Sequence, residues 1–136
     1  MIDFAERIRT GIENATTADG ERAEIERILE QLDAAVRSAT FGNDRLFVGK
    51  FRNAEDEEVM RISDLRHRLV IRSTENEHEG RIIAGWEIDS HGGYSVNLVY
   101  EFQSLYCSDG DELMEELGNL LETARVGRAI QYFANR

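Results

Sequence analysis

RIIAGWEIDSHGGYSVNLVYEF, residues 81–102, is the stretch that decides the fold. Apolar side chains alternate with polar or small ones through both halves of it, which is the period of a strand with one buried face. The run SHGG at residues 90–93 separates the two halves, and such a run is typical of a hairpin turn. The sequence therefore predicts antiparallel strands at residues 81–89 and 94–102.

The residues before this hairpin continue the same pattern. Short apolar runs separated by turn-forming residues occur at 45–52, 58–63 and 68–74. Together with the hairpin they predict a five-stranded antiparallel meander, in which each strand pairs with the next. One face of this sheet is strongly apolar, so other elements must cover it.

The N-terminal part of the chain is predicted to be helical. Apolar residues recur every three or four positions over residues 2–18 and again over residues 25–39, which indicates amphipathic helices. The first of these stretches includes Phe4, Ile8 and Ile12. The run TTADG at 16–20 interrupts the pattern, and Asp19 can cap a following helix. We therefore expect two N-terminal helices.

The C-terminal part is also predicted to be helical. Ser108 and Asp111 have the spacing of a capping box, and leucines at helical spacing follow them. Gly127 leaves open whether this segment forms one helix or two. The predicted fold class is α+β over residues 1–136 as a single domain, with two N-terminal helices, the five-stranded meander and a C-terminal helix. The helices are expected to pack on one face of the sheet.

The composition favours a folded protein of a reducing compartment. Hydrophobic residues make up 41% of the 136 residues, which is enough for one core. The single cysteine, Cys107, forms no disulfide within the chain. The acidic start does not resemble a secretory signal, and no uncharged stretch approaches the roughly 20 residues that span a bilayer. We expect a cytoplasmic protein without membrane contact.

The charge balance points to a protein partner. The chain has 27 acidic and 16 basic residues and a formal net charge of -11. Such a negative field repels nucleic acid and attracts basic protein surfaces. Direct binding to nucleic acid is therefore disfavoured, and the predicted partner is a basic protein surface, such as that of a nucleic-acid-binding protein.

The residues that carry chemistry form no recognisable motif. His67, His78 and His91 match no metal-ligand spacing, so we expect no metal and no cofactor. Cys107 precedes a predicted helix N-terminus, whose dipole would lower the pKa of its thiol, and it is the best candidate nucleophile. The alternative is an inert, buried cysteine. We expect no catalytic residue and a protein that is not an enzyme.

Acidic residues cluster at two predicted turns and at the start of the C-terminal helix. Acids near a helix N-terminus are favourable for the helix itself, so the third cluster needs no partner. The two turn clusters flank consecutive hairpins and are expected at the same end of the sheet. There they would form either a solvated surface that only confers solubility or a docking surface for a basic partner. Weak binding of a divalent cation is a third alternative. The predicted partner-binding residues are Glu55, Asp56, Glu57, Glu58, Glu75, Glu77 and Glu79.

Two main functions remain open at this point. The first is an acidic inhibitor whose carboxylates mimic nucleic-acid phosphates and occupy a basic site, of the immunity-protein or phage anti-defence (anti-CRISPR-like) kind. The second is a homodimeric chaperone or adaptor that holds a client through an apolar sheet or helix face. The chain resembles secretion chaperones in general character, although it lacks their usual helix between the third and fourth strands. An enzyme centred on Cys107 or a histidine is a third alternative.

Overall fold

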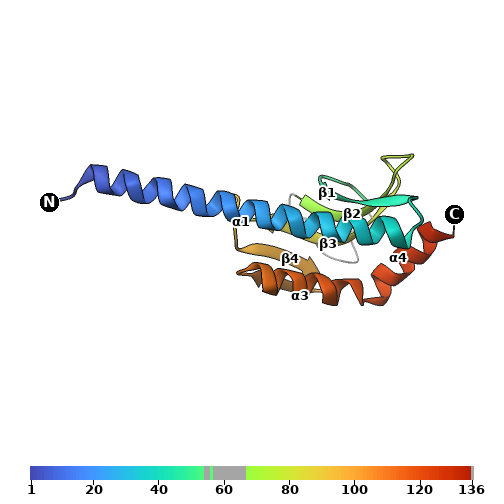
Figure 1. The fold of residues 1–136 in the computed structure, drawn as a ribbon. Helices are drawn as coiled ribbons and strands as arrows, with labels where there is room; N and C mark the ends of the chain where they lie inside the picture. Colours follow the sequence, from blue (N-terminus) through green and yellow to red (C-terminus); the bar gives the residue numbers. More distant parts are fainter. Residues whose placement is uncertain (54–55, 57–66, 136) are drawn as a thin grey trace.

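The structure is a computed structural model that describes residues 1–53, 56 and 67–135. It combines a long N-terminal helix, a five-stranded antiparallel sheet and two C-terminal helices (Figure 1), which confirms the α+β fold class. The elements are α1 (Phe4–Ala39), β1 (Asp44–Gly49), β2 (His67–Ser73), β3 (Gly80–Ile88), β4 (Val96–Tyr100), β5 (Gln103–Cys107), α3 (Gly110–Leu121) and α4 (Ala124–Ala134).

The sheet is a meander in the order β1-β2-β3-β4-β5. The predicted hairpin of residues 81–102 is present, since Trp86 pairs with Leu98 and Ile88 with Val96 across β3 and β4. The second strand of that hairpin ends earlier than predicted. Glu101 and Phe102 adopt positive φ angles of 49° and 65°, which suits a two-residue hairpin turn. The chain therefore reverses there and forms β5.

The membership of the sheet differs from the prediction in one strand. The sequence predicted a strand at 58–63, and that segment lies outside the described residues. The fifth strand in the structure is β5, a stretch that the sequence analysis had not assigned to a strand. Its burial is weak, with Cys107 as its one fully buried residue, which explains why no alternating apolar pattern marks it.

The two N-terminal helices of the prediction form one continuous helix. The 36-residue α1 is capped at its N-terminus by Asp3, whose carboxylate accepts hydrogen bonds from the backbone N–H groups of Ala5 and Glu6. Thr16 and Thr17, which the prediction placed in a break, donate their hydroxyls to backbone carbonyls four residues earlier. These bonds satisfy the threonine hydroxyls inside the helix, so the polar run does not interrupt it.

The C-terminal segment is two helices, which answers the question that the sequence left open. The break falls at Glu122 and Thr123, and the Thr123 hydroxyl accepts a hydrogen bond from the Val126 N–H at the start of α4. Gly127 lies within α4. The turn lets α4 leave the direction of α3 and bring Phe133, which is fully buried, into the core.

The core lies between the helices and the sheet. The second half of α1 packs with α3, α4 and β1, while α4 also reaches β2 and β3. The buried side chains of α1 recur at helical spacing, and all of them lie beyond residue 24: Ile25, Ile28, Leu32 and Val36. Burying this apolar stripe is the main source of stability for that half of the helix.

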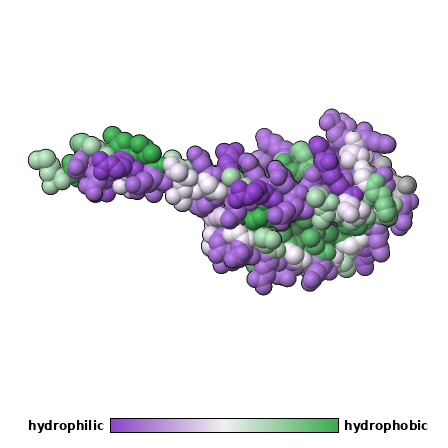
Figure 2. All heavy atoms as spheres, viewed as in Figure 1, coloured by the Kyte–Doolittle hydropathy of each residue, from purple (hydrophilic) through white to green (hydrophobic). Residues whose placement is uncertain are grey.

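The first half of α1 extends beyond the rest of the protein (Figure 1). Residues 1–17 are all exposed, and the first buried residue of the helix is Ile25. Figure 2 shows an apolar patch on this projection. Within the described residues, no helix has the length and apolarity that crossing a membrane requires.

Candidate partner-binding surfaces

The projecting segment, which we define as residues 1–20, carries a stripe of apolar side chains that are exposed to water. Phe4, Ile8 and Ile12 follow one another at a spacing of four residues, so they lie along one side of the helix. Their exposed fractions are 74%, 65% and 63%. The spacing of apolar residues predicts the same residues on the apolar side of a helix that packs on the sheet. They lie instead beyond its edge.

The projecting segment gains little helical stability from packing on the body. Most helical stability in proteins comes from such packing, and residues 1–17 are all exposed. The projecting segment includes Gly11 and Gly20, and each costs about 1 kcal/mol relative to alanine in a helix interior. Within the single chain, the projecting segment is therefore supported mainly by its continuity with the packed half of α1.

The junction between the projecting segment and the body is firmly held. The Tyr94 hydroxyl donates a hydrogen bond of 2.6 Å to the Glu24 carboxylate. Burial and this carboxylate both raise the pKa of Tyr94. The turn between β3 and β4 also approaches α1 closely, since a Cβ at Gly93 would lie 3.2 Å from the Cβ of Glu21. The helix is thus fixed at residues 21–24 and projects from that point.

A groove of about 550 Å³ runs beside the junction. It lies between the projecting segment and the turn that joins β3 to β4. Small helix residues form one wall and the turn forms the other, and the lining includes Gly11, Ala15, Ala18, His91, Gly93 and Tyr94. Polar and acidic side chains complete the lining, so the groove combines small residues with Asn14, Thr17, Asp19, Glu21 and Asp89.

The predicted acidic surface is only partly brought together. Glu75 and Glu77 are exposed in the turn between β2 and β3, and Glu79 is half-buried there. Glu55, Glu57 and Glu58 lie outside the described residues. A pocket of about 640 Å³ beside the turn is lined by three arginines as well as by the acids: Arg37, Arg45, Arg72, Glu75 and Glu77. The local charge is therefore mixed.

Asp56 is a buried residue, unlike the exposed partner-binding residue that the sequence predicted. Its side chain is 1% exposed. Its carboxylate accepts hydrogen bonds from the Arg81 guanidinium at 2.9 and 3.2 Å and from the Ile82 N–H at 3.1 Å, and it also pairs with Arg125. A carboxylate with these partners holds elements of the fold together and cannot contact a protein partner.

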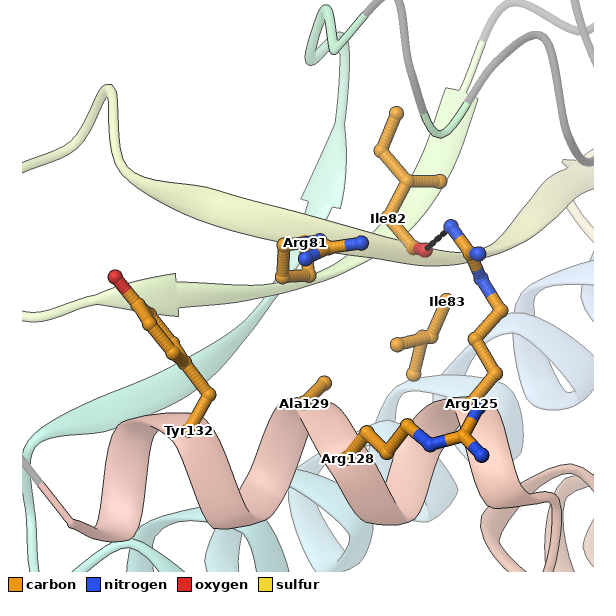
Figure 3. Close-up of a pocket in the computed structure, with 7 residues that line it drawn as sticks. All are labelled: Arg81, Ile82, Ile83, Arg125, Arg128, Ala129 and Tyr132. Atoms are coloured by element: carbon orange, nitrogen blue, oxygen red, sulfur yellow. Dashed lines mark hydrogen bonds between the residues drawn. The ribbon is translucent and has the colours of Figure 1, made fainter.

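The two arginines that hold Asp56 also line a pocket of about 380 Å³ between β3 and α4 (Figure 3). Figure 3 shows Arg125 and Tyr132 reaching from α4 towards the strand, with Arg125 bonded to the Ile82 carbonyl. Arg128 and Tyr132 follow Arg125 at helical spacing, a signal that sequence reasoning missed. Because Asp56 already pairs with both Arg81 and Arg125, these charges are used mainly inside the fold.

Cys107 does not have the lowered pKa that its place before a helix predicted. The residue is 1% exposed. Burial, followed by the negative charges of Glu116, Glu112 and Asp109, raises the pKa of the Cys107 thiol to about 11. A thiol of this kind is almost wholly protonated near neutral pH and is a poor nucleophile. The alternative reading, an inert buried cysteine, fits the structure.

The histidines are also spread over exposed positions. His67 is exposed at the start of β2, and the side chains of His78 and His91 are 87% and 81% exposed. His91 bonds to Asp89, and its backbone and ring hydrogen bonds lower the pKa of that carboxyl. Over the described part of the chain, no three His, Cys, Asp or Glu residues lie together as a metal site would require.

Comparison with known proteins gives no relative for this chain. It matches no protein-family model, no curated protein sequence and no solved structure.

Proposed function

We propose that this protein acts by binding another polypeptide through the projecting segment of α1, as an adaptor or a subunit of an assembly. The observation that carries the proposal is the apolar stripe of Phe4, Ile8 and Ile12, which is exposed on a helix without the body beneath it. Amphipathic helices bind partners through apolar anchors at such spacing. An exposed apolar patch of this kind is a typical feature of protein interaction sites.

Photo-crosslinking in the source cell tests this proposal. A photoreactive phenylalanine derivative replaces Phe4 in one variant and Thr10, which is exposed on another side of the helix, in the matched control. We expect irradiation to give one discrete protein adduct from position 4 and none from position 10. Mass spectrometry of the adduct identifies the polypeptide that covers the stripe. Equal labelling from both positions, or no adduct from position 4, would overturn the proposal.

The second candidate is the acidic inhibitor that occupies a basic site on a nucleic-acid-binding protein, of the immunity-protein or anti-defence kind. The exposed Glu75 and Glu77 and the net charge of -11 support it. It ranks second because Asp56 is buried and arginines lie beside the acidic turn. Changing Glu75 and Glu77 together to Gln should weaken such binding and reduce its salt dependence. Unchanged affinity in the double variant would remove this candidate.

The proposal also includes a non-catalytic role in the cytoplasm. It is supported by the single cysteine, whose buried thiol has a raised pKa, a state suited to a reducing compartment. An enzyme centred on Cys107 would need a nearby base that activates the thiol. Among the residues that the structure describes, the hydrogen bonds of His91 go to Asp89 rather than to Cys107.

A further inference from the structure

Two residues of the exposed stripe, Phe4 and Ile8, belong to a longer repeat that runs the whole length of α1, and Ile12 lies beside that repeat. Residues that are four and three positions apart alternately form a seam, which we define as Phe4, Ile8, Gly11, Ala15 and Ala18. The same spacing continues through Arg22 to Ile25, Leu29, Leu32 and Val36, which pack in the core. A 4-3 spacing is that of the a and d positions of a coiled coil. The exposed seam therefore continues the side of α1 that already packs.

The side chains of the seam become smaller from the tip of the helix towards the body. Phe4 and Ile8 near the tip are large, whereas Gly11, Ala15 and Ala18 nearer the body are small. A Cβ added at Gly11 would have no atom within 4 Å, so no contact within the described part of the chain requires a glycine at that position. Small residues on a helix face let a second helix approach closely, and packing then favours large side chains opposite small ones.

The projecting segment is also nearly neutral in a strongly acidic protein. It contains the acids Asp3, Glu6, Glu13 and Asp19 and the bases Arg7 and Arg9, a formal charge of -2. The remaining residues, 21–136, therefore carry -9 of the total of -11. Two copies of this chain repel one another through their bodies. They can meet with little repulsion along this segment.

We infer that the occupant of the seam is a second copy of this chain, whose projecting segment pairs with the first in an antiparallel direction. This inference rests on the proposed function and names its partner. With Gly11 opposite Gly11, each Phe4 lies against Ala18 of the other copy and each Ile8 near Ala15. Large side chains then face small ones along the whole seam. A parallel pair would instead place Phe4 on Phe4 and leave the small residues facing each other.

Charge and shape both favour the antiparallel direction. In this arrangement the two bodies lie at opposite ends of the paired helices, about 30 Å apart at 1.5 Å per residue over 20 residues. That distance exceeds the Debye length of about 8 Å at physiological salt, so the bodies scarcely repel each other. The tip of each helix also reaches the junction groove of the other copy, where Tyr94 and the small helix residues lie.

Analytical ultracentrifugation of the purified full chain tests the pairing. We expect a concentration-dependent monomer–dimer equilibrium for the natural sequence. Ile8→Glu places a charge in the seam and should give a monomer, whereas Thr10→Glu adds the same charge outside the seam and should leave the dimer intact. Both positions are exposed in the single chain, so neither change should unfold the body. Circular dichroism checks that point.

The outcomes separate the second copy from any other partner. A natural chain that stays monomeric at every concentration overturns self-pairing, and so does an Ile8→Glu variant that still dimerises. A photo-crosslink from position 4 to a different protein overturns self-pairing while keeping the proposed function. A crosslinked species of twice the chain mass supports both. Absence of any crosslink at position 4 removes the proposed function itself.

Engineered cysteines test the direction of the pair. Ile8→Cys and Ala15→Cys are prepared as separate single variants, and the natural Cys107 is buried and does not compete. An antiparallel pair should form a disulfide only when the two variants are mixed. Like positions then lie about 10 Å apart along the helix axis, beyond the reach of a disulfide. Efficient crosslinking of either variant with itself would overturn the antiparallel arrangement.

Discussion

At the scale of single residues, Asp56 connects β3 and α4 through its buried carboxylate. Changing Asp56 to Asn removes a buried negative charge that pairs with Arg81 and Arg125 and accepts the Ile82 N–H. Breaking a buried ion pair in this way typically costs 3–5 kcal/mol, and we expect about 2–4 kcal/mol here. The lower figure reflects the Arg81 side chain, which is 43% exposed. Urea denaturation of the full chain measures this change.

The matched control for Asp56 is Glu77, which belongs to the other predicted acidic cluster. Glu77→Gln also removes one negative charge, but the Glu77 side chain is 75% exposed. We expect a change in the free energy of unfolding of no more than about 0.5 kcal/mol. Equal effects of the two substitutions would show that the Asp56 carboxylate does not support the fold.

The Cys107 thiol makes stability depend on alkaline pH. Its folded-state pKa is raised to about 11 by burial, so the folded state disfavours the thiolate. The contribution of this group is complete below about pH 9 and is lost as the pH rises from 9 towards 11. A Cys107→Val variant should lose less stability over that range than the natural chain does. The raised pKa values of Tyr94 and Tyr100 act in the same direction.

The reactivity of Cys107 gives an independent check. At pH 8 a thiol of pKa about 11 has a thiolate fraction roughly a hundredfold below that of an ordinary cysteine. A thiol reagent should therefore modify the folded protein at least about a hundredfold more slowly than the urea-unfolded protein. Rapid modification of the native protein would contradict the buried, protonated thiol.

Asp56 and Cys107 show why the residue scale is the hardest to predict from sequence. Both could be identified as notable by their residue type and neighbours, one as part of an acidic run and one as preceding a helix. Their environments depend on contacts with distant parts of the chain. Arg125 lies 69 positions from Asp56, and no local pattern indicates that pairing.

At the scale of elements, a substitution at Gly11 separates the stability of the helix from the stability of the dimer. Gly11→Leu raises helix propensity by up to about 1 kcal/mol, and the single chain has room for the side chain. In the antiparallel pair the same side chain lies where the two helices approach most closely, so self-association should weaken. Ultracentrifugation of this variant should therefore show a weaker dimer, whereas circular dichroism should show no loss of helix in the dissociated chain.

Gly20 provides the control for Gly11. A Cβ at Gly20 also has no atom within 4 Å, and residue 20 lies outside the seam. Gly20→Ala should strengthen the helix without weakening the pair, so amides of the projecting segment should exchange more slowly. A Gly20→Ala variant that dimerises as poorly as Gly11→Leu would contradict the placing of the seam.

Elements with a strong local pattern were predictable, and those decided by position in the fold were not. The hairpin of β3 and β4 and the helical character of residues 4–39 follow from the spacing of apolar residues. The turn at Glu101 and Phe102 was missed because the alternating pattern runs through it. The continuity of α1 was missed because Asp19 and Gly20 favour a helix boundary over a helix interior, whereas the helix runs through both residues. Half of α1 lies beyond the sheet. This position depends on the tertiary structure, and the spacing of apolar residues cannot predict it.

At the scale of the whole molecule, salt separates the two candidate functions. Antiparallel self-pairing keeps the two acidic bodies about 30 Å apart and their repulsion weak, so raising the salt from about 0.05 to 0.5 M should strengthen the dimer slightly or leave it unchanged. Docking of acidic turns on a basic partner should weaken over the same range. Ultracentrifugation across this series measures the first effect. A dimer that dissociates as salt rises would contradict pairing through the nearly neutral seam.

The most direct test is hydrogen exchange of the α1 amides as a function of protein concentration. If a second copy covers the projecting segment, amides 4–18 should gain protection as the concentration rises, while those of the core strands should not change. In Ile8→Glu the same amides should exchange rapidly at every concentration. Protection of amides 4–18 that is independent of concentration and equal in the natural chain and in Ile8→Glu would contradict the pairing.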